Sequence, residues 1–245
     1  MTPIYETRQQ DITSKVAEST NSQTPVKSRD LRSNDAIQKK LEESFRDLGY
    51  YYERKVRQYE TEAPELRIDS LAAGQAYLAF YENLPEVAKK DRARIFGDLY
   101  EVIFNDDITA EKLLLSFLIC RQIESRKRDA QGKVRNNQKV DEREWFAVEG
   151  TYHVLNAVKV FCELLQVDEP REEDWMPLIP HAIALIGDAV SSEVQQDHFF
   201  SSAKFFKDGK TKGRLHALAF KYGIEQLIND PMSGQSPPLS SFVDY

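Results

Sequence analysis

Apolar side chains recur at helical spacing through most of this chain, from Asp69 onward, and this periodicity constrains the fold more than any other feature. The first such stripe comprises Leu71, Ala72, Ala76, Tyr77, Ala79 and Phe80. Apolar residues three and four apart lie on one face of a helix. No regular alternation of apolar and polar residues follows Val56, which argues against a large sheet. We therefore expect a mainly α protein.

Further helical signals follow along the chain. Residues 113–123 are apolar enough to form a central helix, and the polar stretch 125–142 after them predicts a flexible linker. Beyond the linker, the apolar spacing predicts one long amphipathic helix over residues 145–165. Two more helices are expected over residues 175–190 and 214–228.

The segment before residue 60 has a different pattern. Residues at helical spacing here are Ile37, Leu41, Phe45 and Leu48. Gly49 follows them where a left-handed residue commonly ends a helix. The aromatic run 50–56 predicts a strand. A loop is expected through Ser33, and Asn34 or Asp35 can cap the helix after it, because each offers a side-chain oxygen to the first backbone amides.

These patterns divide the chain into three parts. Residues 1–60 predict a small α+β part, which also includes a short strand over 4–6 and a short helix over 9–19. An all-helical domain is expected over residues 68–230. Residues 231–245 predict a flexible tail.

Composition limits the class of protein. The chain has 245 residues, enough to bury a stable core without disulfides. Cys120 and Cys162 both lie in apolar helical patterns, so we expect small core residues and no disulfide or metal pair. No apolar run approaches the roughly 20 residues that cross a bilayer, and the N-terminus lacks the layout of a signal peptide. A soluble, cytoplasmic protein with no membrane partner is expected.

The formal net charge is −7, but the basic residues are unevenly placed. One basic run comprises Arg121, Arg126, Lys127, Arg128, Lys133, Arg135 and Lys139. Residues 163–174, in contrast, are acidic. Contact with phosphates depends on where the charges lie more than on their sum. One face of the protein is therefore expected to meet phosphates while another repels them.

Polar and basic side chains are most concentrated between residues 21 and 55. An arginine can donate two hydrogen bonds to a phosphate, Asn and Gln can read base edges, and an exposed tyrosine can stack on a base. The candidate ligand-binding residues are Asn21, Gln23, Thr24, Arg29, Asp30, Arg32, Asn34, Asp35, Tyr51 and Arg54. In the alternative interpretation, Arg29 and Arg32 pair with Asp30, Asp35 or Glu53 and only fix the loop.

The same segment resembles a known family. Its sequence NSQTPVKSRDLRSND at residues 21–35, followed by YYYERK at 50–55, resembles that of the abortive infection phage resistance (AIPR) family of bacterial defence proteins. The likeness continues over residues 71–123. It implies a role in defence against phage. Members of that family resemble larger proteins with a nuclease-like N-terminal region and an NG-x-QT motif, so we expect this chain to be a C-terminal portion.

Three molecular roles are compatible with these observations. The first is a module that binds DNA, RNA or a protein partner. The second is a metal-dependent nuclease, in which Glu53 and Lys55 share one face of a strand, hold Mg²⁺ and position water. The second acid that such a site needs is not identified. The third is an assembly module that docks on a missing N-terminal half or on another defence protein.

No catalytic activity is expected of the chain by itself, and no cofactor unless the nuclease alternative holds. The four histidines, at positions 153, 181, 198 and 216, have no metal-ligand spacing on one helix face, so no metal site is expected.

Overall fold

The computed structural model describes residues 28–197 and 199–228. The strand expected over 4–6, the helix expected over 9–19 and the expected tail lie outside the described residues. The mainly α prediction is confirmed, because the regular elements of the described chain are helices apart from two short strands. Among the described residues, no helix is both long and apolar enough to cross a membrane.

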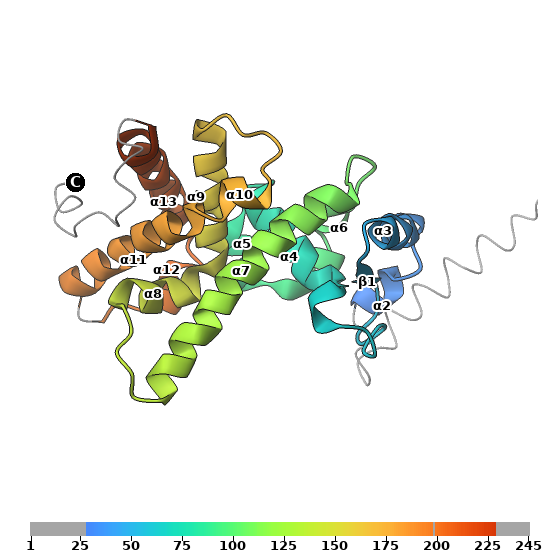
Figure 1. The fold of residues 1–245 in the computed structure, drawn as a ribbon, viewed down its shortest axis with the longest axis horizontal. Coiled ribbons are helices and arrows are strands. Elements are labelled where there is room, and N and C mark those ends of the chain that lie inside the picture. The colour runs from blue at the N-terminus through green and yellow to red at the C-terminus, as the bar shows by residue number, and fades with distance from the viewer. Residues whose placement is uncertain (1–27, 198, 229–245) are drawn as a thin grey trace, which may run out of the picture.

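Figure 1 shows the N-terminal elements at one end of the molecule and the C-terminal helices at the other. Between them α7 (Ala110–Arg135) runs through the middle. The N-terminal elements, in order, are α2 (Ser28–Arg32), α3 (Ala36–Asp47), β1 (Tyr51–Glu53), η1 (Pro64–Leu66) and β2 (Arg67–Asp69). A loop was expected to continue through Ser33, but residues 28–32 form α2. That prediction was therefore wrong for these residues.

The two strands form a small parallel sheet in which Glu53 lies opposite Asp69. The strand expected over residues 50–56 is confirmed only over residues 51–53. Gly49 has φ of +81° and ends α3 as expected. The strand β2 was not predicted, because a three-residue strand leaves no alternating pattern.

Aromatic packing fixes α3 on this sheet. The rings of Phe45 and Tyr52 stack with centroids 4.9 Å apart. The buried Tyr52 hydroxyl donates a hydrogen bond to Gln38 Oε1 at 3.0 Å, so the polar end of a fully buried ring is satisfied. One ring and one amide therefore join the helix and the strand.

The centre of the fold is α4 (Ser70–Phe80), which is buried on nearly every side. A helix that is apolar all round belongs in a core. It contacts α5 (Pro85–Lys90), α7 and α9 (Thr151–Leu164). The connection from α5 to α7 contains η2 (Arg92–Phe96) and α6 (Tyr100–Ile103).

The polar stretch expected as a linker is mostly helix. Helix α7 continues through it to Arg135, and only residues 136–141 connect it to α8 (Glu142–Ala147). This stretch contains no proline, and its Arg, Lys, Ala and Gln residues all favour helix. Polarity alone therefore misidentified a solvated helix as a linker.

The long helix expected over 145–165 is broken. Its parts are α8, a turn η3 (Val148–Gly150) and α9. A Cβ atom at Gly150 would lie 2.6 Å from Phe206 Cζ. Close approach of this ring to the backbone therefore requires a glycine at the break.

The C-terminal helices extend beyond their expected limits. The remaining elements are α10 (Glu172–Trp175), α11 (Leu178–Gln196), α12 (Ser202–Phe205), α13 (Gly209–Tyr222) and the π-helix η4 (Gly223–Ile228). Pro180 lies in the first turn of α11, where no intrahelical amide bond is lost. Asp208 caps α13 by accepting a hydrogen bond from the Lys210 amide at 3.0 Å, so this helix begins before residue 214, where it was expected to start.

Helices α8 and α11 meet at Gly187, and we predict that Gly187→Ala destabilises the protein by about 1–3 kcal/mol. A Cβ atom there would lie 2.6 Å from Arg143 Cα, which is backbone and cannot rotate away. Gly132→Ala on α7 is the control, because a Cβ there meets nothing within 4 Å, and it should stabilise by about 0.5–1 kcal/mol. Urea unfolding of both variants measures the difference. Equal effects would contradict the close approach of the two helices.

Candidate functional site

The predicted binding residues do not form one exposed surface. Asn21, Gln23 and Thr24 lie outside the described residues. The others lie on α2, in the turn before α3, and on or just after β1; they are Arg29, Asp30, Arg32, Asn34, Asp35, Tyr51 and Arg54. The nuclease candidates Glu53 and Lys55 lie in the same region. What each contacts decides whether it is available to a ligand.

Arg29 is buried, with 5 % of its surface exposed, and its guanidinium bonds three groups inside the protein. Nη1 donates to Asp69 Oδ2 at 2.6 Å, Nη2 donates to the Glu53 carbonyl at 3.0 Å, and Nε donates to the Arg54 carbonyl at 3.1 Å. The side chain thus joins α2 to the ends of both strands. In this conformation its donors are used internally.

Arg54 is also engaged within the protein. Its Nε donates to Glu42 Oε2 at 2.8 Å, and its Nη1 donates to the Ser33 carbonyl. Glu42 accepts a further bond from the Tyr59 hydroxyl at 2.6 Å. Burial opposes ionisation of Glu42, but the bonds from Tyr59 and Arg54 outweigh it and hold the pKa of this carboxyl below its ordinary value.

Arg32 is the most exposed arginine in this group, with 42 % of its side chain accessible. It pairs with Asp35 at 3.3 Å and with Glu101 at 3.7 Å, and its guanidinium lies 4.4 Å from the centroid of the Tyr100 ring. Asp35 stands at the N-cap of α3 but makes no capping bond with its side chain. The pairing with Asp35 is one that the sequence left open.

The nuclease alternative requires Glu53 and Lys55 on one strand face, and this is not the case. Strand β1 ends at Glu53, and Lys55 lies in the exposed bend after it. Glu53 is buried; its Oε1 accepts from the Tyr59 amide at 3.2 Å and lies 4.0 Å from Arg67 Nη1. Its carboxylate is held by internal contacts.

A nuclease site needs a second acid on the neighbouring strand. Asp69 has that position, because it lies opposite Glu53 in the sheet. Both of its oxygens are already bonded. Oδ1 accepts from the Ala72 amide at 2.8 Å and caps α4, and Oδ2 accepts from Arg29. In the described parts of the chain, no group of three or more His, Cys, Asp or Glu residues could hold a metal ion.

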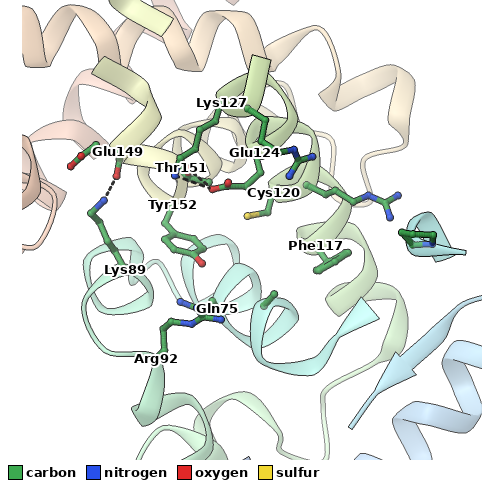
Figure 2. A pocket seen from close by; sticks show the side chains of 14 residues that line it. Gln75, Lys89, Arg92, Phe117, Cys120, Glu124, Lys127, Glu149, Thr151 and Tyr152 are labelled. Carbon is green, nitrogen blue, oxygen red and sulfur yellow. Dashed lines mark hydrogen bonds and ion pairs between the residues drawn. The ribbon is translucent and has the colours of Figure 1, made fainter. Parts of the chain in front are cut away.

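A second candidate site lies elsewhere in the fold, in a cavity lined by basic side chains. The cavity, of about 670 Å³, lies among α4, α5, η2, α7 and α9 (Figure 2). Its lining residues are Pro64, Ala72, Gln75, Lys89, Arg92, Phe117, Cys120, Arg121, Glu124, Lys127, Arg128, Glu149, Thr151 and Tyr152. Five of them are basic and two are acidic. We call this the basic cavity.

One face of helix α7 forms one wall of the basic cavity. Phe117, Arg121, Glu124 and Arg128 are separated by four, three and four residues, and side chains so spaced lie on one helix face. The basic run noted in the sequence thus turns several of its members toward one cavity. Lys89 of α5 and Arg92 of η2 also line the cavity. The sequence of α7 gives no indication that these two residues lie beside it.

The two acidic residues of the lining are engaged. Glu124 Oε1 accepts from the Thr151 hydroxyl at 2.8 Å and lies 3.7 Å from Lys127 Nζ. Glu149 accepts through its carboxylate from Ser202 at 3.3 Å and through its carbonyl from Lys89. Their negative charge is therefore partly compensated before any ligand arrives.

The cations are held to different degrees. Burial lowers the pKa of Lys89, whose ammonium lies 5.6 Å from the centroid of the Phe206 ring. Arg121 lies 5.8 Å from the centroid of Phe117 and donates to the Glu65 carbonyl. The side chains of Arg92 and Arg128 make no hydrogen bond or ion pair with any other described residue. Two guanidinium groups at the cavity are therefore available to an anion.

We predict that Arg29→Ala lowers the free energy of unfolding by about 3 kcal/mol, because it strands two buried carbonyls and the partly buried Asp69 carboxylate. Arg32→Ala should cost less than about 1 kcal/mol, since exposed ion pairs contribute little. Urea unfolding followed by circular dichroism checks both. Similar small losses would mean that Arg29 is not the structural link described above.

Neither a search of curated proteins nor a search of solved structures returned a match. A family model does match: the one described as AIPR protein covers residues 2–208. The match spans the described N-terminal part, α7 and the whole lining of the basic cavity. This chain therefore belongs to the AIPR family, whose setting is abortive-infection defence against phage.

Proposed function

We propose that this AIPR chain serves phage defence by binding nucleic acid, and that the basic cavity is where it contacts phosphates. The observation that carries the proposal is the convergence of five basic side chains from three elements on one cavity, in a chain whose net charge is −7. Like charges repel, so their grouping needs an explanation beyond packing.

The state of the individual arginines supports this location over the predicted arginine segment. Arg29 and Arg54 use their guanidinium groups for bonds inside the protein. Arg92 and Arg128 have no such partner among the described residues. A phosphate accepts paired hydrogen bonds from a guanidinium, and an arginine that is not already bonded gives up least to provide them. Exposed Arg32 can add a contact at a distance from the cavity.

The other two roles have less support in the geometry. Glu53 and Asp69, the acids that a nuclease would use, are held by Arg67 and Arg29. Docking on another polypeptide stays a prediction.

The test is a titration of the chain with a short fluorescent single strand at two salt concentrations. Affinity should fall steeply as salt rises, because phosphate contacts release counterions. In Arg92→Ala/Arg128→Ala the salt slope should shrink by about 1.4, from about 0.7 for each lost phosphate contact. Fluorescence anisotropy measures both quantities.

The matched control is Arg94→Ala/Arg171→Ala. It removes the same charge, but Arg94 is bonded to Asp98 and Arg171 lies exposed beyond the cavity lining. Binding that is flat with salt, or an equal loss in both double variants, would contradict the proposal and favour the assembly role.

A further inference from the structure

The basic cavity has the size of a small-molecule site. Pockets that enclose a ligand commonly measure about 300–1,000 Å³, and this one measures about 670 Å³. A double helix cannot enter a hollow of that size, whereas one nucleotide can. If nucleic acid is the ligand, as proposed above, then what enters must be an unpaired or terminal unit.

Two aromatic rings accompany the cations. Phe117 on α7 and Tyr152 on α9 both line the cavity and both are half-buried. Figure 2 shows the Tyr152 ring between Lys89, Arg92 and Cys120, and Phe117 on another side of the hollow. Aromatic faces beside arginines are the usual platform for a nucleobase. A site for inorganic phosphate alone would need no such rings.

Two polar side chains at the cavity can orient the same ligand. The Tyr152 hydroxyl makes no hydrogen bond with any other described residue, so it is available to a ligand. Gln75 is buried, lines the cavity and donates through Nε2 to the Ala88 carbonyl at 2.6 Å. Its amide is therefore held in place at the cavity. Fixed polar groups of this kind give an orientation to a bound base or sugar.

We propose that the basic cavity is a nucleotide site, which takes one nucleotide with its phosphates, either as a separate molecule or as the terminal unit of a strand. The base stacks on Tyr152 or Phe117. Arg92 and Arg128, whose guanidinium groups make no hydrogen bond or ion pair in the described chain, bind the phosphates. This inference rests on the proposed function for its ligand class and adds that the contact is with a single unit.

The first experiment uses the unaltered chain and compares ligands. ATP, adenosine and tripolyphosphate are titrated by calorimetry, and ATP is expected to bind at least tenfold more tightly than either fragment, because it alone provides both ring and phosphates. Single strands with a 5′-phosphate, with a 5′-hydroxyl and in circular form separate the sources. Preference for the phosphorylated end identifies a strand terminus, and preference for ATP identifies a separate nucleotide.

Two pairs of variants locate the ligand. Tyr152→Ala should weaken ATP binding by about fivefold to a hundredfold, while Tyr152→Phe keeps the ring and most of the affinity. Ala72→Phe fills the cavity without changing any charge and should abolish ATP binding. Ala93→Phe is its control, because Ala93 is exposed and does not line the cavity. Thermal unfolding confirms that each variant is folded.

The outcomes separate the two proposals. If neither ATP nor a strand end competes with the labelled strand, or if Ala72→Phe binds as well as the unaltered chain, the nucleotide site is refuted. Salt-sensitive strand binding that survives in Ala72→Phe would still support the proposed function. Tight ATP binding without salt-sensitive strand binding would refute the proposed function and leave the nucleotide site.

Discussion

The unbroken course of α7 is the constraint on which the arrangement depends. Its 26 residues extend about 39 Å at 1.5 Å per residue. The helix contacts α3, α4, α8 and α9, so it joins the N-terminal part to the C-terminal helices. Its first half buries Leu113 and Ile119 in the core, and its second half carries most of the basic run. Burial of the first half thus fixes the direction in which the second half presents its charges.

Much of the fold was predictable because the buried face of a helix or strand is visible in the sequence as regularly spaced apolar residues. The α4 stripe, the α3 stripe with Gly49 after it and the aromatic strand are all visible as spacing. Three features were missed because their causes lie elsewhere in the chain. The strand β2 exists through pairing with β1, and the break at Gly150 exists because Phe206 packs against it. The second half of α7 was missed because a solvated helix is polar.

The internal contacts of the candidate arginines could not be read from the sequence, and their binding to phosphates stays a prediction. The sequence indicated that arginines would meet phosphates, and it left open whether Arg29 only fixes its segment. Its main partner, Asp69, is 40 residues away, and no spacing rule pairs the two. The basic run on α7 was visible as composition. What could not be read was that Lys89 and Arg92 would be brought to the same cavity by the packing of α4 and α5 against α7 and α9.

Hydrogen–deuterium exchange with and without a 5′-phosphorylated single strand tests most directly whether the basic cavity is the contact surface. Binding there predicts slower amide exchange in peptides covering residues 117–128 and 149–152, with no change over residues 28–54. Protection confined to residues 28–54 would place the ligand on the arginine segment and contradict the central claim.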